Sequence, residues 1–290
     1  MTTIAEAIAE ATSRLQAADL DDPRREARLI VGAALKKTST QVFNYINDEI
    51  NETDAERIGS LVTRRVAGEP SAYIVGEREF WSLPLKVSPA TLIPRPDSET
   101  LIEMVLDVYD EMRPRRILDL GTGSGCLLLA LLGEYRNASG VGVDISSEAI
   151  SVAIKNAEQN KLSDRCQFIQ GSWTDKIEEH FDLIVSNPPY IPTRDINDLE
   201  KDVRAYEPLG ALDGGEDGLD MYRAIFPKLD RVLSVNGHVA VEIGLGQAED
   251  VVRIAEKNGF DWLNSRKDIS GIVRVLMFAK KRVGNTEPKR

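Results

Sequence analysis

The chain has 290 residues, of which 42% are hydrophobic and 29% charged, a composition typical of a globular protein with one ordinary domain and a smaller companion. A formal net charge of −11 argues against a protein that follows duplex DNA or a membrane surface, because phosphate binding draws on clustered lysine and arginine. It has two cysteines, no secretory leader pattern and no apolar run long enough to span a bilayer, so we expect a soluble cytoplasmic protein without disulfides or a metal site.

The first part of the chain has the pattern of amphipathic helices. Apolar residues recur at spacings of three and four from Ile4 to Leu15. Pro23 opens a second helix, since proline at a first helical position gives up no hydrogen bond. Further helical patterns run over residues 41–46 and 54–66, and Gly68 and Pro70 stop the last of them. Residues 1–72 are therefore predicted to form a bundle of about four helices, which we interpret as a docking domain or lid without chemistry of its own.

A hairpin and a stiff linker are predicted over residues 73–96. From the start of this segment, apolar residues tend to recur at every second position, which favours two short strands. Arg95 then stands between two prolines that restrict its backbone, so this turn is interpreted either as a linker or as a functional loop. Asp97 or Ser98 is expected to cap the helix that follows, through Met112.

From Arg116 onwards, predicted strands and helices alternate, which favours a mostly parallel sheet with helices on both faces. The last two strands leave no room for a helix between them and are expected to form an antiparallel hairpin. The predicted fold class is α/β, with a Rossmann-like seven-stranded sheet over residues 97–282 and a flexible tail over residues 283–290. The predicted strands cover residues 117–120, 140–144, 167–170, 182–186, 238–243, 262–265 and 273–279, and the helices cover 125–133, 147–161, 218–233 and 247–258.

The first of these strands runs into a glycine-rich turn that opens a helix, made of Gly121, Thr122, Gly123, Ser124 and Gly125. Glycines let the backbone approach a ligand and adopt positive φ. The glycine spacing differs from that of dinucleotide-binding loops, and Asp119, just before the first glycine, would repel a pyrophosphate. Such a carboxylate suits a ligand with a cationic end, such as the amino-acid part of S-adenosylmethionine.

Two further strand ends supply candidate ligand contacts. Asp144 closes the second strand, where a ribose-binding acid is expected, and Trp173 follows the third strand, where its ring could cover an adenine. Ligands in open α/β sheets lie beyond the carboxyl ends of the strands, so these segments are predicted to converge on one crevice.

The fourth strand ends abruptly in Asn187, Pro188, Pro189 and Tyr190. The prolines fix φ and remove two backbone donors, so the carbonyl groups beside them are held rigidly with no competing N–H. The side-chain carbonyl of Asn187, the backbone carbonyl of Pro188 and the ring of Tyr190 could together grip a flat NH2 group. This stretch is therefore predicted to bind an amide or amino nitrogen.

These four segments, in this order and each at a strand end, resemble the class I S-adenosylmethionine-dependent methyltransferases. The sequence Asn-Pro-Pro-Tyr is similar to that of the branch acting on amino and amide nitrogens, which includes adenine-N6 DNA, guanine-N2 RNA and protein glutamine methyltransferases. An amide nitrogen is a poor nucleophile because its lone pair is delocalised into the carbonyl group. The enzyme's contribution would therefore be orientation and electrostatics, without a general base.

The helical amino-terminal part, the hairpin around Phe80, the turn around Arg95 and the loop over residues 202–208 narrow the resemblance to the HemK/PrmC family. That resemblance implies methyl transfer from S-adenosylmethionine to N5 of the glutamine in the Gly-Gly-Gln motif of class 1 peptide-release factors. Residues 1–72 would then form the substrate-docking domain. Ser98 stands where threonine is more usual in the family, a change expected to leave the helix cap intact.

The resemblance also implies roles for the candidate site residues. Catalysis is expected from Asn187, Pro188 and Tyr190. The substrate glutamine is expected to contact these three and Pro189, with Phe80 and Arg95 as further candidates for its pocket and core packing as their alternative role. Cofactor contacts are expected from Asp119, Gly121, Thr122, Gly123, Ser124, Gly125, Asp144, Ile145, Trp173 and Asn187.

A nucleic-acid amino methyltransferase is the main alternative, because the same stretch would accept the amino group of adenine or guanine. That alternative predicts a basic surface and, for duplex substrates, a base-flipping target-recognition domain, whereas this chain is acidic and its extra domain is small and helical. We therefore expect no stable binding to nucleic acid and none to membranes.

A non-enzymatic alternative is a scaffold that binds the cofactor and regulates a partner. Such a scaffold would not need an intact Asn-Pro-Pro-Tyr. Solvated or packing roles are expected for the histidines and cysteines, His180, His238, Cys126 and Cys166.

Overall fold

The computed structural model describes residues 2–109 and 113–281 of the chain. The predicted tail over residues 283–290 and the predicted helix end at Met112 lie outside the described residues. The chain divides into two compact units, one made of Met1–Glu77 with Glu200–Tyr206 and the other of Arg78–Leu199 with Glu207–Arg290. In the part of the chain that the structure describes, no helix is long and apolar enough to cross a membrane.

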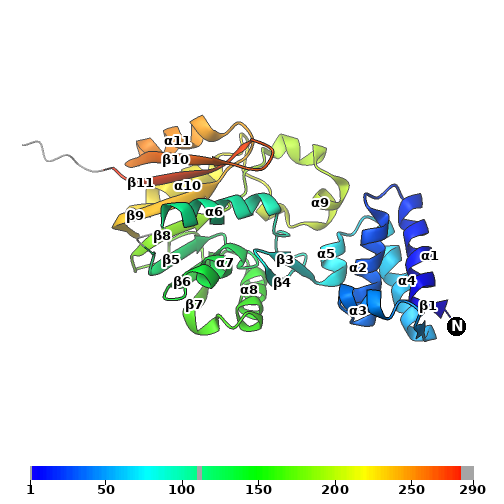
Figure 1. Cartoon of the computed structure of the whole chain (residues 1–290). Helices are drawn as coiled ribbons and strands as arrows, with labels where there is room; N and C mark the ends of the chain where they lie inside the picture. The colour runs from blue at the N-terminus through cyan, green and yellow to red at the C-terminus, as the bar shows by residue number, and fades with distance from the viewer. Residues whose placement is uncertain (1, 110–112, 282–290) are drawn as a thin grey trace, which may run out of the picture. The chain divides into compact units, whose positions relative to one another are not determined.

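The first unit is helical, as predicted, and its amino-terminal helices are blue to cyan in Figure 1. Two short strands, β1 (Thr2–Thr3) and β2 (Glu49–Ile50), pair antiparallel beside the helices. Residues 73–75, predicted to be extended, instead lie in a helix whose buried Tyr73 and Ile74 outweigh their strand propensity. The helices are α1 (Ile4–Ala17), α2 (Pro23–Leu35), α3 (Ser39–Asn44), α4 (Glu52–Val66), α5 (Ser71–Val75) and α9 (Lys201–Tyr206).

Local sequence signals explain where the first helix begins and which side it buries. Thr3 Oγ1 accepts the N–H of Glu6, and the Glu6 carboxylate accepts the N–H of Thr3, a reciprocal capping box. The apolar stripe of α1 packs on α2 and α4, with Leu15 and Ile30 fully buried in the shared core. The amphipathic pattern thus accounts for this bundle.

The second unit is built on a seven-stranded sheet of order β10-β11-β9-β8-β5-β6-β7. Strands β5 to β9 run parallel, whereas β10 and β11 form the predicted antiparallel hairpin at one edge, so the predicted fold class is confirmed. The chain adds β6 and β7 on one side of β5 and then β8 on the other, and such a switch point is where open α/β sheets bind ligands. The strands are β5 (Arg116–Leu120), β6 (Ser139–Asp144), β7 (Cys166–Gln170), β8 (Phe181–Ser186), β9 (Leu233–Glu242), β10 (Phe260–Lys267) and β11 (Val273–Lys280).

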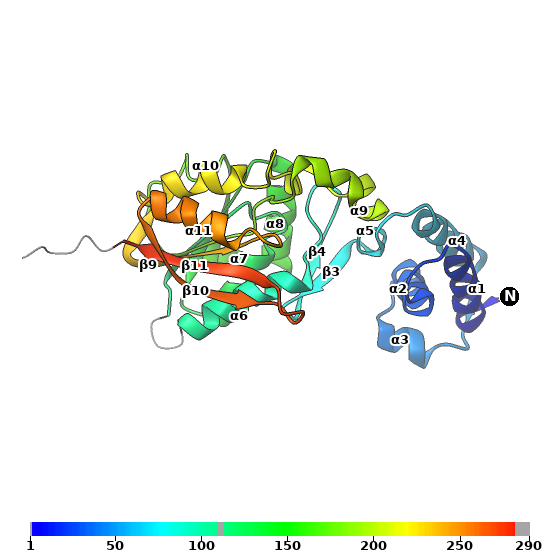
Figure 2. The ribbon, with the colours of Figure 1, turned by 90° about the horizontal axis from the view of Figure 1, so that it is seen from above.

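Helices cover both faces of this sheet, as Figures 1 and 2 show. The helices α6 (Glu99–Val108), α7 (Cys126–Glu134) and α8 (Ser147–Gln159) supply one core, and α10 (Asp220–Leu229) and α11 (Ala248–Lys257) supply the other. Along β8, Leu183 and Val185 belong to the first core and Ile184 to the second, as the alternation of side chains in a strand requires. Short 3-10 turns complete the unit: η1 (Pro96–Ser98), η2 (Ser163–Arg165), η3 (Thr193–Asp198) and η4 (Leu209–Ala211).

The predicted hairpin is present as the two-stranded sheet of β3 (Glu77–Phe80) and β4 (Leu83–Lys86). Its two turn residues, Trp81 and Ser82, have φ of 50° and 60°, the geometry of the tight turn that matches strand twist. Phe80 is 1% exposed and packs into the core that α6 and α7 form on the sheet. The hairpin is therefore anchored by apolar burial.

Candidate active site

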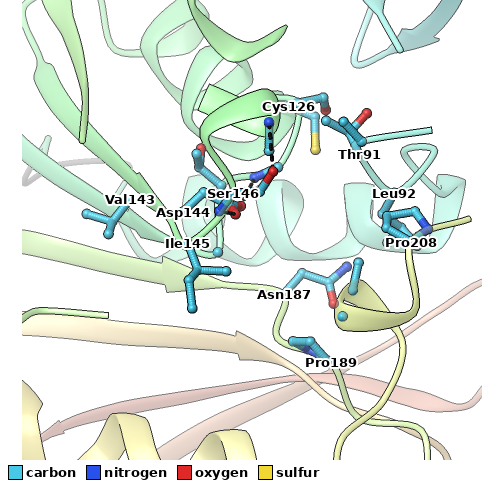
Figure 3. A pocket seen from close by; sticks show the side chains of 18 of the residues that line it. Thr91, Leu92, Cys126, Val143, Asp144, Ile145, Ser146, Asn187, Pro189 and Pro208 are labelled. Carbon is cyan, nitrogen blue, oxygen red and sulfur yellow. Dashed lines mark hydrogen bonds between the residues drawn. The ribbon is translucent and has the colours of Figure 1, made fainter. Parts of the chain in front are cut away.

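A cavity of about 770 Å³ lies in the second unit, at the carboxyl ends of the central parallel strands (Figure 3). Many of the residues predicted from the sequence line it, whereas Asp119, Gly125, Pro188, Tyr190 and Phe80 do not. Figure 3 shows Asn187 between Ile145 on one side and Leu92 with Pro208 on the other. The predicted residues in the lining are Arg95, Gly121, Thr122, Gly123, Ser124, Asp144, Ile145, Trp173, Asn187 and Pro189.

The glycine-rich turn is held against the end of β6. The carbonyl group of Val143 accepts the N–H of Gly121 at 2.8 Å. Gly121 and Gly123 have φ of +74° and +53°, conformations that other residues rarely adopt. The Asp144 carboxylate accepts the N–H of Gly123 through Oδ2 at 2.8 Å and the N–H of Ser146 through Oδ1 at 2.9 Å. Each oxygen keeps a further lone pair, so Asp144 can also accept hydrogen bonds from a ligand in the cavity that it lines.

Asp119 lies beneath this turn rather than on the cavity wall. Its side chain is buried, Oδ2 accepts a hydrogen bond from Thr122 Oγ1 at 2.6 Å, and Oδ1 has no hydrogen-bond partner among the described residues. Burial raises the pKa of Asp119 to about 7. A buried carboxylate oxygen without a donor is costly, and a cationic group reaching past the turn would satisfy it.

Two apolar side chains line the cavity next to the turn. Ile145 is 77% exposed, which is unusual for an isoleucine and leaves its side chain available to a ligand. Trp173 packs its ring partly against the second core while still lining the cavity. Together they offer apolar surfaces that suit a flat aromatic ring.

Asn187 projects into the cavity from the end of β8 (Figure 3). Its Nδ2 donates a hydrogen bond to Ser98 Oγ at 3.0 Å, so the other branch of the amide, Oδ1, faces away from Ser98. Ser98 is buried and occupies the N-cap position of α6, as predicted, but its side chain makes no capping hydrogen bond to that helix. The hydroxyl of Ser98 instead orients Asn187.

Hydrogen bonds with two other residues fix the position of Tyr190. Its Oη donates to Glu242 Oε1 at 3.3 Å, and its backbone carbonyl accepts a hydrogen bond from Gln247 Nε2 at 2.9 Å. The ring packs partly against the second core, and burial raises the pKa of its hydroxyl. Contact between this ring and a substrate amide stays a prediction.

Arg95 lines the cavity and forms an ion pair with Glu207. The same carboxylate accepts the N–H of Ile93 at 3.1 Å, and the Glu207 side chain is only 1% exposed. One buried acid therefore joins the proline-punctuated turn to the loop that carries Pro208 and Leu209, which also line the cavity. The pairing leaves Arg95 partly exposed, with its charge balanced.

Phe80 does not reach the cavity, because its ring is enclosed by the core of the second unit. The position of Phe80 matches core packing, the alternative role expected from the sequence. We therefore leave Phe80 out of the substrate pocket proposed below. Sequence reasoning assigned no site role to Glu207 or Glu242. Glu242 could have been found, because it closes an apolar strand with an acid as Asp144 does.

The cysteines and histidines offer no nucleophile or base to the cavity. Cys126 lines it, but burial raises the pKa of this thiol to about 12, so the group stays protonated. Cys166 is half-buried at the start of β7. His238 lies at the start of the apolar run of β9, where its Nδ1 is 2.8 Å from Tyr109 Oη, and His180 is exposed.

Comparisons with known proteins match both parts of the chain. A family model described as the PrmC N-terminal domain matches residues 6–76, and one described as a methyltransferase domain matches residues 113–258. A release factor glutamine methyltransferase from Agrobacterium fabrum is 44% identical over 96% of this chain and 98% of its own length. The chain belongs to the release factor glutamine methyltransferase family. Another member, from Caulobacter vibrioides, is 41% identical over 96% of each chain.

Solved structures agree with the fold of this family member. The catalytic domain of hMettl16, in complex with a hairpin of the MAT2A 3′UTR, has a TM-score of 0.55 at 17% identity and covers 79% of this chain and 82% of its own. A methyltransferase from Pyrococcus furiosus has a TM-score of 0.52 at 19% identity, covering 69% and 89%. The chain is thus a class I methyltransferase that uses S-adenosylmethionine.

Proposed function

We propose that this enzyme transfers a methyl group from S-adenosylmethionine to the side-chain amide N5 of the glutamine in the Gly-Gly-Gln motif of class 1 peptide-release factors. The observation that carries the proposal is the orientation of Asn187, whose Nδ2 is bound to Ser98 beside the glycine-rich turn. The carbonyl branch of this amide is thereby left to accept a hydrogen bond from a substrate NH2 group. The family of the chain supports a glutamine as the carrier of that group.

The residues of the cavity fit S-adenosylmethionine. The open turn at Gly121 and Gly123 lets a ligand approach the backbone, and Asp119 Oδ1 lacks a donor that an ammonium group could supply. We assign the ribose hydroxyls to Asp144 and the adenine ring to the apolar surfaces of Ile145 and Trp173. Thr122, Ser124, Gly125 and Asn187 complete the proposed cofactor set, Gly125 by closing the turn in the left-handed conformation. When bound, the cofactor supplies an electrophilic methyl group.

The residues of this chain would orient the amide nitrogen of the substrate glutamine. Asn187 Oδ1 and the backbone carbonyl of Pro188 would accept the two N–H bonds of the substrate NH2 group and turn its lone pair towards the methyl group. Positive charge develops on the nitrogen during transfer, and both oxygens stabilise it. Tyr190 is proposed to pack on the flat amide and Pro189 to stiffen the stretch. The product needs no protein base, since a protonated amide is acidic enough to lose its proton to water.

The part of the cavity wall that includes Arg95 is assigned to the substrate segment. Arg95, Pro208 and Leu209 line that part of the cavity, and the ion pair of Arg95 with Glu207 fixes its shape. We propose that residues 1–72 dock the body of the release factor, which would leave the cavity to its glutamine loop. We propose that the enzyme acts in the cytoplasm. We expect no stable complex with nucleic acid, because a net charge of −11 opposes binding to phosphates.

The test is the destination of labelled methyl groups. The enzyme is incubated with labelled S-adenosylmethionine and either a class 1 release factor, the same factor with the motif glutamine replaced by asparagine, or nucleic acid. Label on the unaltered factor alone is the expected result. Label on nucleic acid, or on the glutamine-free factor, would overturn the proposal.

A further inference from the structure

Gln247 occupies the N-cap position of α11, but its side chain makes no capping hydrogen bond to that helix. Serine, threonine, aspartate and asparagine are preferred at such a position, because their short side chains accept hydrogen bonds from the first turn. A glutamine that does not cap its helix calls for another role. Its amide bonds instead to Tyr190, the last residue of the stretch over residues 187–190 that is proposed to hold the substrate amide.

The Gln247 amide joins three segments of the second unit. Oε1 accepts the N–H of Gly244, which follows β9, at 2.9 Å. Nε2 donates to the backbone carbonyl of Tyr190 at 2.9 Å and to that of Gly218, which precedes α10, at 3.2 Å. A backbone N–H can only donate and a carbonyl group can only accept, so these three partners allow a single orientation of the amide.

Two of these partners are glycines at which a side chain would strike the amide. A Cβ atom at Gly218 would lie 2.4 Å from the carbonyl oxygen of Tyr190 and 2.6 Å from Gln247 Nε2. A Cβ atom at Gly244 would lie 2.9 Å from Gln247 Oε1 and 3.1 Å from Cδ2 of the Tyr190 ring. The backbone therefore approaches both residues as closely as only glycine permits.

The stretch over residues 187–190 depends on side chains for its anchors. Its two prolines have no backbone N–H, so they cannot donate hydrogen bonds to the surrounding loops. Asn187 is held by Ser98 at one end of the stretch, and the Tyr190 carbonyl is held by Gln247 at the other. The position of the stretch therefore depends on Gln247 as well as on Ser98.

We propose that Gln247 is a positioning residue for methyl transfer, which fixes the end of this stretch and thereby the places of the Pro188 carbonyl group and the Tyr190 ring. The inference rests on the proposed function, in which these two groups contact the substrate amide. Gln247 does not line the cavity, so in this scheme it touches neither substrate nor cofactor. A misplacement of about 1 Å at a reacting group can cost about 100-fold in rate, so a loosened stretch should slow transfer.

The kinetic test compares Gln247→Leu and Gln247→Glu in the full-length enzyme, with a class 1 release factor as substrate. Gln247→Leu removes all three hydrogen bonds of the amide. Gln247→Glu keeps the shape of glutamine, but a carboxylate oxygen would then face the carbonyl oxygens of Tyr190 and Gly218. We expect kcat to fall about tenfold or more in Gln247→Leu and further in Gln247→Glu, with much smaller changes in the Kd of S-adenosylmethionine. The opposite order would mean that side-chain shape governs the loss, and it would overturn the inference.

Gly244→Ala tests the same contact from the other side. Its Cβ atom would displace the Gln247 amide and crowd the Tyr190 ring, so kcat should fall in this variant too. Gly133→Ala on α7 is the matched control, because a Cβ atom there meets nothing within 4 Å and Gly133 does not line the cavity. This control should keep the kcat of the wild type. Equal kcat values in the two alanine variants would contradict the role of the contact.

Tyr109→Phe separates positioning from stability. Tyr109 Oη donates to the backbone carbonyl of Asp182, near the other end of β8, at 2.6 Å, and Tyr109 does not line the cavity. This variant should lower Tm with kcat unchanged. Wild-type kcat in both Gln247 variants would overturn the inference. Losses that follow Tm or cofactor affinity instead of kcat would also overturn it, because they would make Gln247 merely structural.

Amide hydrogen exchange tests the inference without activity. Ile191 directly follows the stretch, its N–H donates to the Leu212 carbonyl at 3.0 Å, and its own carbonyl accepts the N–H of Gly214 at 2.8 Å. Both amide protons should exchange at least about tenfold faster in Gln247→Leu than in the wild type and should change little in Tyr109→Phe. If the wild type fails to methylate glutamine, the proposed function falls, and this comparison still decides whether Gln247 holds the stretch. Unchanged exchange of both protons in Gln247→Leu would refute the inference.

Discussion

The side-chain amide of Asn156 on α8 donates a hydrogen bond to the carbonyl group of Ser124 in the glycine-rich turn at 2.8 Å. The same amide accepts the N–H of Lys86 at 2.6 Å and donates to the Lys86 carbonyl at 3.0 Å. Asn156 is fully buried, so one polar side chain ties strand β4 of the hairpin to the cofactor turn. The hairpin thus supports the turn that we propose to bind the cofactor, although it does not line the cavity.

Asn156→Ala is expected to damage both stability and cofactor binding. It leaves the backbone groups of Lys86 and the Ser124 carbonyl unpaired in the interior, at a cost of about 2–4 kcal/mol of unfolding free energy. The Kd of S-adenosylmethionine should rise as well, which calorimetry can measure. Asn258→Ala is the control, since Asn258 loses one bond to Ile254 at the end of α11. Equal effects of the two variants on cofactor affinity would contradict the supporting role of Asn156.

Asp144→Ala should act mainly on cofactor affinity. The variant loses the acceptor proposed for the ribose hydroxyls and also the hydrogen bonds from Gly123 and Ser146 that shape the turn. We expect the Kd of S-adenosylmethionine to rise about tenfold or more, as for the loss of charge-assisted hydrogen bonds, with a smaller fall in kcat at saturating cofactor. An unchanged Kd would remove Asp144 from the ribose site.

Arg95→Ala should be more harmful than the double variant Arg95→Ala with Glu207→Gln. Removing the guanidinium alone leaves the buried Glu207 carboxylate without its cation, and neutralising that acid relieves the cost. Because Arg95 is partly exposed, the stability loss should be modest, and the main expected effect is a higher KM for the release factor. Thermal melts and substrate titrations of the single and double variants decide this. Additive losses in the double variant would show that the two residues act separately.

The buried carboxyl group of Glu242 predicts how the stability of the protein depends on pH. The pKa of Glu242 is raised from 4.5 to about 7, so the folded protein binds a proton that the unfolded chain releases. The stability from this group is fully present below pH 4.5 and is lost as the pH rises through about 7. Glu242→Gln carries no such charge, so its stability relative to the wild type should increase between pH 5 and pH 8, by up to about 3 kcal/mol. Urea denaturation without cofactor measures this, and a constant difference at both pH values would contradict it.

The sequence predicted the sheet, its antiparallel edge and the strand ends that form the cavity, because alternation of strands and helices and the residues after each strand are local signals. It did not predict the partners of those residues. The contacts between Asn187 and Ser98 and between Arg95 and Glu207 join segments about a hundred residues apart, and no local pattern encodes them. Phe80 shows a different limit. An aromatic residue in a family motif can line a pocket or pack in the core, and the sequence alone did not show that Phe80 is buried in the core.

The most direct test of the account is methyl transfer by Asn187→Ala, measured in a single turnover on a class 1 release factor together with the Kd of S-adenosylmethionine. Loss of the Asn187 carbonyl should lower the rate of transfer at least about 100-fold, as removal of one transition-state hydrogen-bond partner does, while the cofactor still binds. A near-normal rate of glutamine methylation in this variant would contradict the proposed mechanism.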